Sequence, residues 1–312
     1  MTLKNKILSF SVFVIMIFLT HFFTLNLLKT TNYGNLGNWN EIIKGERSDD
    51  YIFLGSSRTT QHINNDYIKN NFGLESYNLG IDGGMFDLHL EKLKIYLKYN
   101  SKPTNIVIGL DSEAFQTKKG IHNIHQFVHI CNQESLLNTI QSYDSKFFLV
   151  KYIPLYGLTY FDPLQTLSLI KHSVVPNDNN VYKNGFNPVY ASFNEEFERF
   201  KIINPNGINF KVDNNLIKKL ESIIKLSLKN EIKVFLVFSP SYSEVQNYIN
   251  NRTEIINIYE SLSQKYDIPF LDFSDSYISQ NKKYFYNSQH LNYTGAKEFT
   301  RILMTQLTNK KR

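Results

Sequence analysis

The chain has 312 residues, of which 42% are hydrophobic and 20% are charged, and this composition excludes a disordered or fibrous protein. Its net charge of +6 is located at the two ends, where Lys4, Lys6, Lys29 and residues 310–312 supply six positive charges. The rest carries 28 basic and 28 acidic residues, and such a neutral body argues against binding to a nucleic-acid backbone. The single cysteine, Cys131, excludes an intramolecular disulfide.

The N-terminal segment predicts a membrane anchor. Residues 7–28 contain no formal charge, and about 20 apolar residues are enough to span the hydrocarbon core of a bilayer. Lys4 and Lys6 precede this run, so the positive-inside rule places the N-terminus in the cytoplasm and the rest of the chain outside it. A cleaved signal peptide is the alternative, but the run is long and ends without a small-residue cleavage site. We therefore expect an anchor at 1–29, followed by a linker at 30–47.

Beyond this linker, short apolar runs alternate with helical patterns. Strands are expected at residues 51–54, 76–80, 105–110, 233–238 and 268–273, and helices at 63–71, 85–99, 214–229, 243–265 and 294–307. Residues 112–207 interrupt the alternation with a stretch rich in Tyr, Phe, Asn and Pro, in which no regular order of strands and helices is expected. A loop-rich stretch of this kind often forms a lid or a binding surface.

The alternation predicts an α/β fold. We expect a three-layer α/β/α sandwich around a flavodoxin-like parallel sheet of about five strands, in addition to the N-terminal transmembrane helix. The α/β domain is expected to cover residues 48–308, with an insertion at about 112–207, and residues 309–312 are expected to form a basic tail. Ligands of such sheets bind beyond the carboxyl ends of the strands, where the candidate site residues lie.

Two motifs far apart in the chain contain a possible nucleophile and a possible base. Residues 53–58 (FLGSSR) place Ser56 and Ser57 just past the first strand, and residues 285–292 (FYNSQHLN) contain His290. A serine past a strand with a histidine able to reach it is the minimal nucleophile–base arrangement. Serines at such positions are more often turn formers, so the pattern alone favours a structural role.

On these motifs the chain resembles the SGNH (GDSL-like) hydrolase family, particularly its membrane-anchored bacterial branch. The family's Gly-Asp-Ser after the first strand is matched by residues 55–57, and its final Asp-x-x-His-Leu by residues 287–291. Gly80 matches the family's glycine after the second strand, and residues 109–111 fall where the family has Gly-x-Asn after the third. The resemblance covers roughly residues 48–308, apart from the insertion.

This resemblance implies a serine hydrolase site. Ser57 would be the nucleophile and His290 the general base, and the backbone N–H groups of Ser57 and Gly80 would form part of the oxyanion hole. Ser56 occupies the family's Asp position and is expected to point the other way.

The third member of the triad departs from the family. The family's Asp is Asn287 here, and an amide cannot stabilise an imidazolium as a carboxylate does. Asn287 stays the candidate for the third catalytic residue, and a backbone carbonyl or a nearby acid such as Asp272 or Asp275 is the alternative for orienting His290.

The oxyanion hole departs as well. The family's Asn is matched by Asp111, whose ionised form would repel an oxyanion, so that Asp111 is protonated, or has another role, or Asn78 supplies the missing donor. Arg58 and His62 follow the nucleophile closely and are candidates for substrate contact. An ion-paired Arg58 and a His62 that only stabilises the start of a helix are the alternatives.

His122, His125 and His129 raise the question of a metal site. The last two are spaced i, i+4 on one helical face, which can bind a metal when a carboxylate joins them. No Glu lies in this run, and we expect neither a metal nor a cofactor.

The resemblance and the anchor together imply an extracytoplasmic, membrane-anchored serine esterase or O-acyltransferase. We expect it to act on O-acyl groups, most simply acetyl, of an envelope or exported polysaccharide, with a membrane acyltransferase as a candidate partner. The alternative is a non-catalytic binding or accessory protein of envelope polysaccharide assembly that keeps the fold without the full triad.

Overall fold

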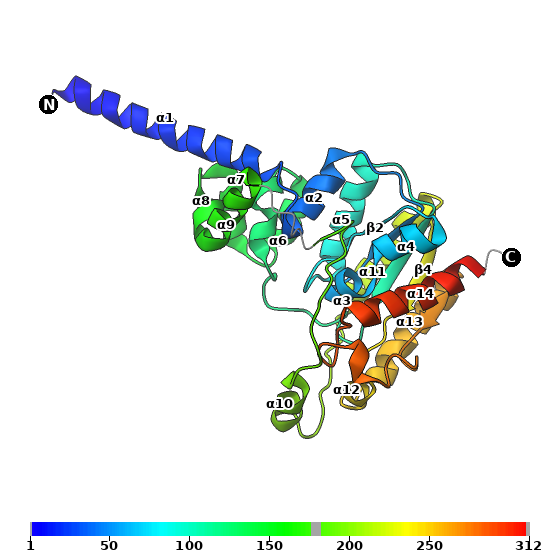
Figure 1. The fold of residues 1–312 in the computed structure, drawn as a ribbon. Coiled ribbons are helices and arrows are strands. Elements are labelled where there is room, and N and C mark those ends of the chain that lie inside the picture. The colour runs from blue at the N-terminus through cyan, green and yellow to red at the C-terminus, as the bar shows by residue number, and fades with distance from the viewer. Residues whose placement is uncertain (1, 176–181, 310–312) are drawn as a thin grey trace. The chain divides into compact units, whose positions relative to one another are not determined.

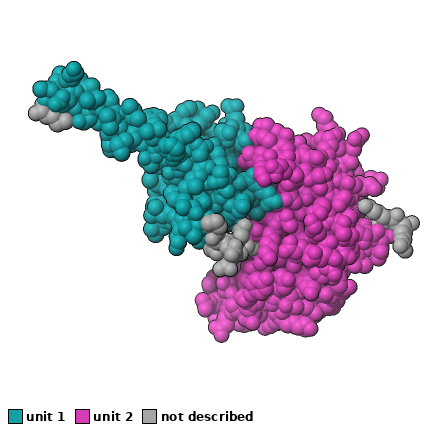
Figure 2. Space-filling view, turned by 45° about the horizontal axis from the view of Figure 1, so that its top comes forward, with its two compact units in different colours: residues 1–41, 119–180 teal, residues 42–118, 181–312 magenta. Residues whose placement is uncertain are grey.

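The computed structural model describes residues 2–175 and 182–309, so the expected basic tail lies outside the described residues except for Asn309. The chain divides into two compact units (Figure 2). Unit 1 comprises residues 1–41 and 119–180, and unit 2 comprises residues 42–118 and 181–312.

Unit 2 is built on a five-stranded parallel sheet in the order β2-β1-β3-β4-β5, which is the flavodoxin-like order expected. The strands are β1 (Tyr51–Leu54), β2 (Ser76–Asn78), β3 (Asn105–Leu110), β4 (Lys233–Phe238) and β5 (Phe270–Asp272). Most strand residues are buried, as is usual in a parallel sheet covered on both faces. The expected α/β class is confirmed.

Helices cover both faces of the sheet (Figure 1). The helices of unit 2 are α3 (Ser57–His62), α4 (Asn65–Phe72), α5 (Phe86–Tyr99), α10 (Glu196–Ile203), α11 (Asn214–Lys229), α12 (Ser243–Asn247), α13 (Arg252–Tyr266) and α14 (Tyr293–Asn309), with a 3₁₀ turn η3 at Lys282–Tyr284. Helices α4 and α14 pack over the face that carries Phe53 and Val107. On the other face α5 packs against α11, and Tyr259 of α13 packs on Phe238.

One expected helix is wrong. Residues 243–265 form two helices, α12 and α13, instead of one. Between them Ile249 forms a backbone bridge with Ile208, and the side-chain amide of Asn251 bonds both backbone groups of Phe210. Segment 208–210 lies outside the sheet, and the residues between α12 and α13 bond its backbone groups in place of a neighbouring strand.

Unit 1 is helical. It contains α1 (Leu3–Leu28), most of α2 (Gly34–Lys44), η1 (Ile124–Ile130), α6 (Glu134–Gln141), η2 (Ser145–Phe148), α7 (Leu149–Tyr152), α8 (Tyr156–Tyr160) and α9 (Pro163–Val174). Its core includes Trp39, whose ring packs edge-on against Phe127 and whose N–H donates to Gln126 Oε1 at 3.2 Å. Among the described helices, α1 alone is long and apolar enough to cross a membrane.

Two segments therefore contain more structure than expected. The segment 30–47, expected to be a linker, contains α2, which buries Leu36, Trp39 and Ile42. The segment 112–207, expected to lack regular order, is largely a series of short helices. Most of these helices are shorter than three turns, too short to show a clear amphipathic period. The longest, α9, has 12 residues, and Asp162, which caps it by accepting from Gln165 N, is a recognisable helix start.

Candidate active site

Ser57 is the first residue of α3, directly beyond β1. Between them, a Cβ on Gly55 would lie 2.2 Å from Thr59 Oγ1 and 2.8 Å from the carbonyl oxygen of Gly109, so the turn requires glycine. The hydroxyl oxygen of Ser56 caps α3 by accepting a hydrogen bond from the backbone N–H of Arg58 at 3.4 Å. This leaves the side chain of Ser57 partly exposed at the carboxyl edge of the sheet.

His290 lies in the loop between η3 and α14. The loop is closed by a backbone bridge between Phe285 and Leu291, and its Tyr286 ring stacks on the imidazole with 5.6 Å between ring centroids. The structure brings the predicted pair together: Ser57 Oγ lies 2.8 Å from His290 Nε2, although 233 positions separate them in the chain. This is hydrogen-bond distance for a nucleophile and its base.

Asn287 completes a triad. Its Oδ1 lies 3.1 Å from His290 Nδ1 and also accepts from the backbone N–H groups of Gln289 at 3.0 Å and His290 at 2.8 Å. Because both backbone groups are donors, the oxygen of the amide faces the imidazole, while its Nδ2 points to Glu196 Oε2 at 3.4 Å. His290 Nδ1 then carries the proton, and Nε2 is the acceptor for the Ser57 hydroxyl.

The alternative, that a nearby acid or a backbone carbonyl orients His290, is therefore wrong. Asp272 accepts instead from the backbone of Ser274 at 2.8 Å, and its other oxygen lies 4.0 Å from Arg252. Among the described residues, Asn287 is the one whose side chain bonds His290 Nδ1.

The electrostatics of the site keep His290 neutral. Burial lowers the pKa of His290 to about 4, and the positive charges of Arg58 and Lys118 act in the same direction, while the Asp111 carboxylate opposes them. At neutral pH the imidazole is thus in the state that a general base requires.

The oxyanion donors differ from the expectation. Asn78 is fully buried, and its amide NH₂ donates to the carbonyl of Thr59 at 2.6 Å, so the expectation that Asn78 supplies an oxyanion donor is wrong. The N–H of Gly80 donates to Asn78 Oδ1 at 3.0 Å. In the part of the chain that the structure describes, the N–H of Ser57 has no acceptor, and it is the one predicted donor available to a ligand.

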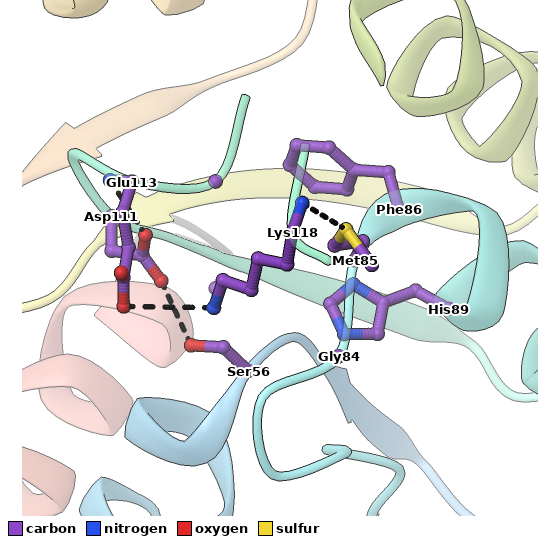
Figure 3. A pocket seen from close by; sticks show the side chains of 10 residues that line it. Ser56, Gly84, Met85, Phe86, His89, Asp111, Glu113 and Lys118 are labelled. Carbon is purple, nitrogen blue, oxygen red and sulfur yellow. Dashed lines mark hydrogen bonds and ion pairs between the residues drawn. The ribbon is translucent and has the colours of Figure 1, made fainter. Parts of the chain in front are cut away.

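Asp111 lines a small pocket next to the triad (Figure 3). Its Oδ2 accepts from Ser56 Oγ at 2.8 Å and its Oδ1 from the backbone N–H of Glu113 at 3.0 Å, a pattern in which the carboxylate only accepts. Lys118 Nζ lies 3.8 Å from Glu113 Oε1 on the same side. The cavity of about 10 Å³ holds at most about one water molecule, and among the described residues no hydrogen bond joins Asp111 to Ser57. Asp111 therefore has another role than that of an oxyanion donor.

His62 and Arg58 are buried, which argues against the substrate contacts considered for them. His62 is fully buried, and its Nε2 accepts from the backbone N–H of Leu291 at 3.0 Å, so it ties α3 to the loop that carries His290. Arg58 is 5% exposed, and its Nη1 has no partner among the described residues. Its effect on the site is that of a buried positive charge on His290.

A family model described as a protein of unknown function, DUF1574, matches residues 29–307. The chain belongs to this family. None of the curated proteins compared matches the DUF1574 chain.

Several solved structures are similar to the DUF1574 chain at low identity. A Bacteroides fragilis protein provisionally assigned as an acylhydrolase is 14% identical with a TM-score of 0.42, and the match covers 88% of this chain and 93% of that one. A GDSL-like lipase from Bacteroides thetaiotaomicron is 13% identical with a TM-score of 0.39, covering 86% and 90%. A mutant acetyl-xylooligosaccharide esterase from Geobacillus stearmophilus is 10% identical with a TM-score of 0.40, covering 84% and 95%.

Two buried ionisable residues of α5 near the site were not predicted. His89 lines the small pocket, and neither ring nitrogen has a partner among the described residues; burial lowers its pKa to about 3. Lys92 donates to the carbonyl of Gly80 at 3.0 Å, and burial lowers its pKa to about 7. Both interrupt the apolar stripe of the predicted helix 85–99, and a polar residue on a buried face was the available signal.

The histidines considered for a metal lie in unit 1. His125 and His129 are buried in the 3₁₀ helix η1, not on an α-helical face. Within residues 2–175 and 182–309, no group of three or more His, Cys, Asp or Glu side chains is placed to hold a metal ion.

Proposed function

We propose that this protein is a serine ester hydrolase or O-acyltransferase in which Ser57, His290 and Asn287 form the catalytic triad. One observation carries the proposal: two bonds in series, Ser57 Oγ to His290 Nε2 at 2.8 Å and His290 Nδ1 to Asn287 Oδ1 at 3.1 Å. A nucleophile, a base and an orienting acceptor in this order define the triad arrangement on any fold.

The chemistry follows from these positions. Ser57 Oγ attacks the ester carbonyl carbon while His290 Nε2 takes the hydroxyl proton, and Asn287 holds the imidazole through Nδ1–H. The tetrahedral intermediate collapses when its C–O bond to the alcohol breaks and His290 returns the proton to that alcohol. Water or a second hydroxyl, deprotonated by His290, then attacks the carbonyl carbon of the acyl–Ser57 ester. The bond from that carbon to Ser57 Oγ breaks, His290 returns the proton to Ser57 Oγ, and the acid or the new ester is released.

Stabilisation of the oxyanion rests mainly on the N–H of Ser57. Gly80 would contribute its N–H only if its bond to Asn78 Oδ1 opened when substrate binds. The negative charge of Asp111 lies on the side of Ser56, where it opposes an oxyanion at Ser57 weakly rather than through direct contact.

The proposed location and substrate class follow from the anchor. The apolar run 7–28 of helix α1 is long enough to span a bilayer and follows Lys4 and Lys6, which supports a domain held at the outer side of the membrane. We take O-acyl groups of an envelope or exported polysaccharide as the substrate class at that location, with a membrane acyltransferase as the candidate source of acyl groups for transfer.

A serine-reactive fluorophosphonate tests the triad. We expect one adduct on Ser57, located by peptide mass spectrometry, and no adduct in Ser57→Ala. The matched control Ser56→Ala removes the neighbouring hydroxyl and should still be labelled, and His290→Ala should label far more slowly. Equal labelling of wild type and Ser57→Ala would contradict the assignment.

The second candidate, a non-catalytic binding or accessory protein, is favoured by the oxyanion site, where Gly80 and Asn78 bond each other and Asp111 replaces an amide. Release of acetate from acetylated oligosaccharides, and transfer of labelled acetyl to a deacetylated acceptor, separate the two functions. Binding of the oligosaccharide with no turnover above the Ser57→Ala background would favour the binding protein.

A further inference from the structure

Unit 1 exposes a concentration of large apolar side chains in its second half. In residues 147–175 only Lys151, Asp162 and Lys171 carry a formal charge. Eight large apolar side chains there are between 43% and 78% exposed, and six of them lie before the last turn of α9, namely Phe148, Tyr152, Ile153, Tyr160, Leu164 and Leu167. Over the described residues of unit 2, which is roughly twice as large, five large apolar side chains are exposed, namely Tyr190, Ile202, Ile203, Leu228 and Tyr277. A patch this dense marks an interaction surface.

This patch is joined to α1 within unit 1. The backbone N–H of Leu155, in the loop between α7 and α8, donates to His21 Nδ1 at 3.1 Å, and α9 packs along α1. Along α1, the face of His21, Thr24 and Leu28 is partly or fully buried, whereas most of the helix is exposed. Figure 1 shows α7, α8 and α9 beside the C-terminal end of α1.

The hydrogen bond from Leu155 to His21 sets the level of the patch along α1, and therefore its depth in a membrane that α1 spans. An α-helix rises 1.5 Å per residue, so His21 lies about 10 Å before the end of α1 at Leu28. The apolar run 7–28 is about 33 Å long on the same rise and the hydrocarbon core of a bilayer is about 30 Å thick. When α1 spans that core, the loop at Leu155 lies below the membrane surface, at the level of the acyl chains.

The polar groups near this level are those that a lipid interface tolerates. Backbone groups in lipid must be bonded internally, and the N–H of Leu155 is bonded to His21. Lys146 Nζ lies 3.3 Å from the hydroxyl of Tyr160, and Lys151 Nζ lies 5.6 Å from the ring centre of Tyr152. Tyrosine and lysine are typical of the membrane–water boundary, where a lysine extends its ammonium toward the lipid headgroups.

We propose that the segment 148–167, from the end of η2 through α7 and α8 into α9, inserts these six exposed apolar side chains into the leaflet in which α1 ends, so that unit 1 is partly embedded in lipid and not merely tethered to it. This inference rests on the membrane anchor of the proposed function, but not on catalysis.

The test places an environment-sensitive NBD label at single cysteines in the full chain, reconstituted in lipid nanodiscs, on a Cys131→Ser background. The patch is probed by Leu164→Cys and Leu167→Cys. Phe18→Cys in α1 is the control for the anchor, and Ser135→Cys, exposed on polar helix α6, is the control for water. Lipids brominated on the acyl chains quench labels that contact those chains.

We expect the labels at 164 and 167 to emit at shorter wavelength than the label at 135 and to lose emission in brominated lipid, as the label at 18 does. Labels at 164 and 167 that resemble the label at 135, while the label at 18 is quenched, would overturn the proposal and leave the anchor intact. An unquenched label at 18 would overturn both. A blue-shifted but unquenched label at 164 would also overturn it, in favour of a protein partner on this face.

Discussion

Replacing Asn287 with aspartate should make the triad faster. In Asn287→Asp a carboxylate oxygen would take the place of Oδ1, 3.1 Å from His290 Nδ1, and keep the two backbone donors that now hold the amide oxygen. The new negative charge stabilises the imidazolium that forms when His290 takes the proton of Ser57. We expect kcat/KM for a small acetyl ester at neutral pH to rise about 10- to 100-fold.

The geometry sets this magnitude. An opposite charge within about 4–6 Å shifts a pKa by roughly 1–3 units, and each unit corresponds to about 1.4 kcal/mol, or tenfold in rate if fully expressed in the transition state. The reverse change in the well-studied Ser-His-Asp proteases costs about 10⁴ because the amide there holds the wrong tautomer. Here the amide oxygen already faces Nδ1–H, so only the electrostatic part is gained. Glu196, 3.4 Å from Asn287 Nδ2, would repel the new carboxylate and lower the gain.

The assay is hydrolysis of p-nitrophenyl acetate from pH 4 to pH 9. Since the pKa of His290 is about 4, the acid limb of wild type should lie near that pH and move upward in Asn287→Asp. Glu196→Gln should raise kcat/KM further when it is combined with Asn287→Asp. Ser57→Ala should remain inactive whether position 287 is Asn or Asp. An Asn287→Asp variant with the wild-type rate and an unmoved acid limb would refute the role given to Asn287.

Four further results are expected. In wild type, kcat/KM should be constant from neutral pH down to about pH 5 and fall as His290 is protonated near its pKa of about 4, as a pH–rate profile measures. His89 has a pKa of about 3 in the folded chain and about 6.5 in the unfolded chain, so the stability it contributes is present above pH 6.5 and is lost as pH falls toward 3. Urea unfolding at pH 7 and pH 4 should show this loss of stability, and the loss should be smaller in His89→Leu. Gly80→Ala should lower the free energy of unfolding by about 1–3 kcal/mol, because its Cβ would lie 2.5 Å from Thr60 Cγ2 and 2.9 Å from Thr60 N. An alkaline phosphatase fused after Asn40 should be active, whereas activity of a cytoplasmic reporter at that point would contradict the topology.

The sheet could be predicted from the sequence because its strands are short, apolar and separated by turn residues. Strands at 51–54, 105–110 and 233–238 begin and end where the sequence predicts. The break in the helix at 243–265 could not be predicted, because its cause is tertiary: Ile249 and Asn251 bond a distant segment at 208–210. Most helices of unit 1 that escaped prediction have eight residues or fewer, too few for a period of 3.6 residues to stand out. The helices α2 and α9, with 11 and 12 residues, escaped prediction although their length allows such a period.

The pairing of Ser57 with His290 could be predicted because it depends on chain order and on strand ends, which the sequence shows. The sequence also places Asn287 at the third position of the triad, but it does not show which way the amide turns, and the role of Asn287 depends on that. That orientation is decided by the backbone N–H groups of Gln289 and His290, which both require an acceptor. Asn78 was misjudged for the related reason that its donors are used inside the fold, on the carbonyl of Thr59.

The two departures from the SGNH pattern are linked through His290. In the pattern that the sequence resembles, a carboxylate stands beside the base and an amide lines the oxyanion hole; here the amide is Asn287 and the carboxylate is Asp111. The charge of Asp111 still raises the pKa of His290, against the larger effect of burial and the charge of Arg58. The Asp111 carboxylate therefore provides part of the negative potential at His290. It acts from the side of the small pocket, whereas the aspartate of a usual triad acts at Nδ1. Since Asp111 bonds Ser56 and the backbone of Glu113 and not the imidazole, it does so without fixing the ring. In the proposed triad, the two roles that one aspartate has in the usual triad, orientation and charge, are thus divided between Asn287 and Asp111.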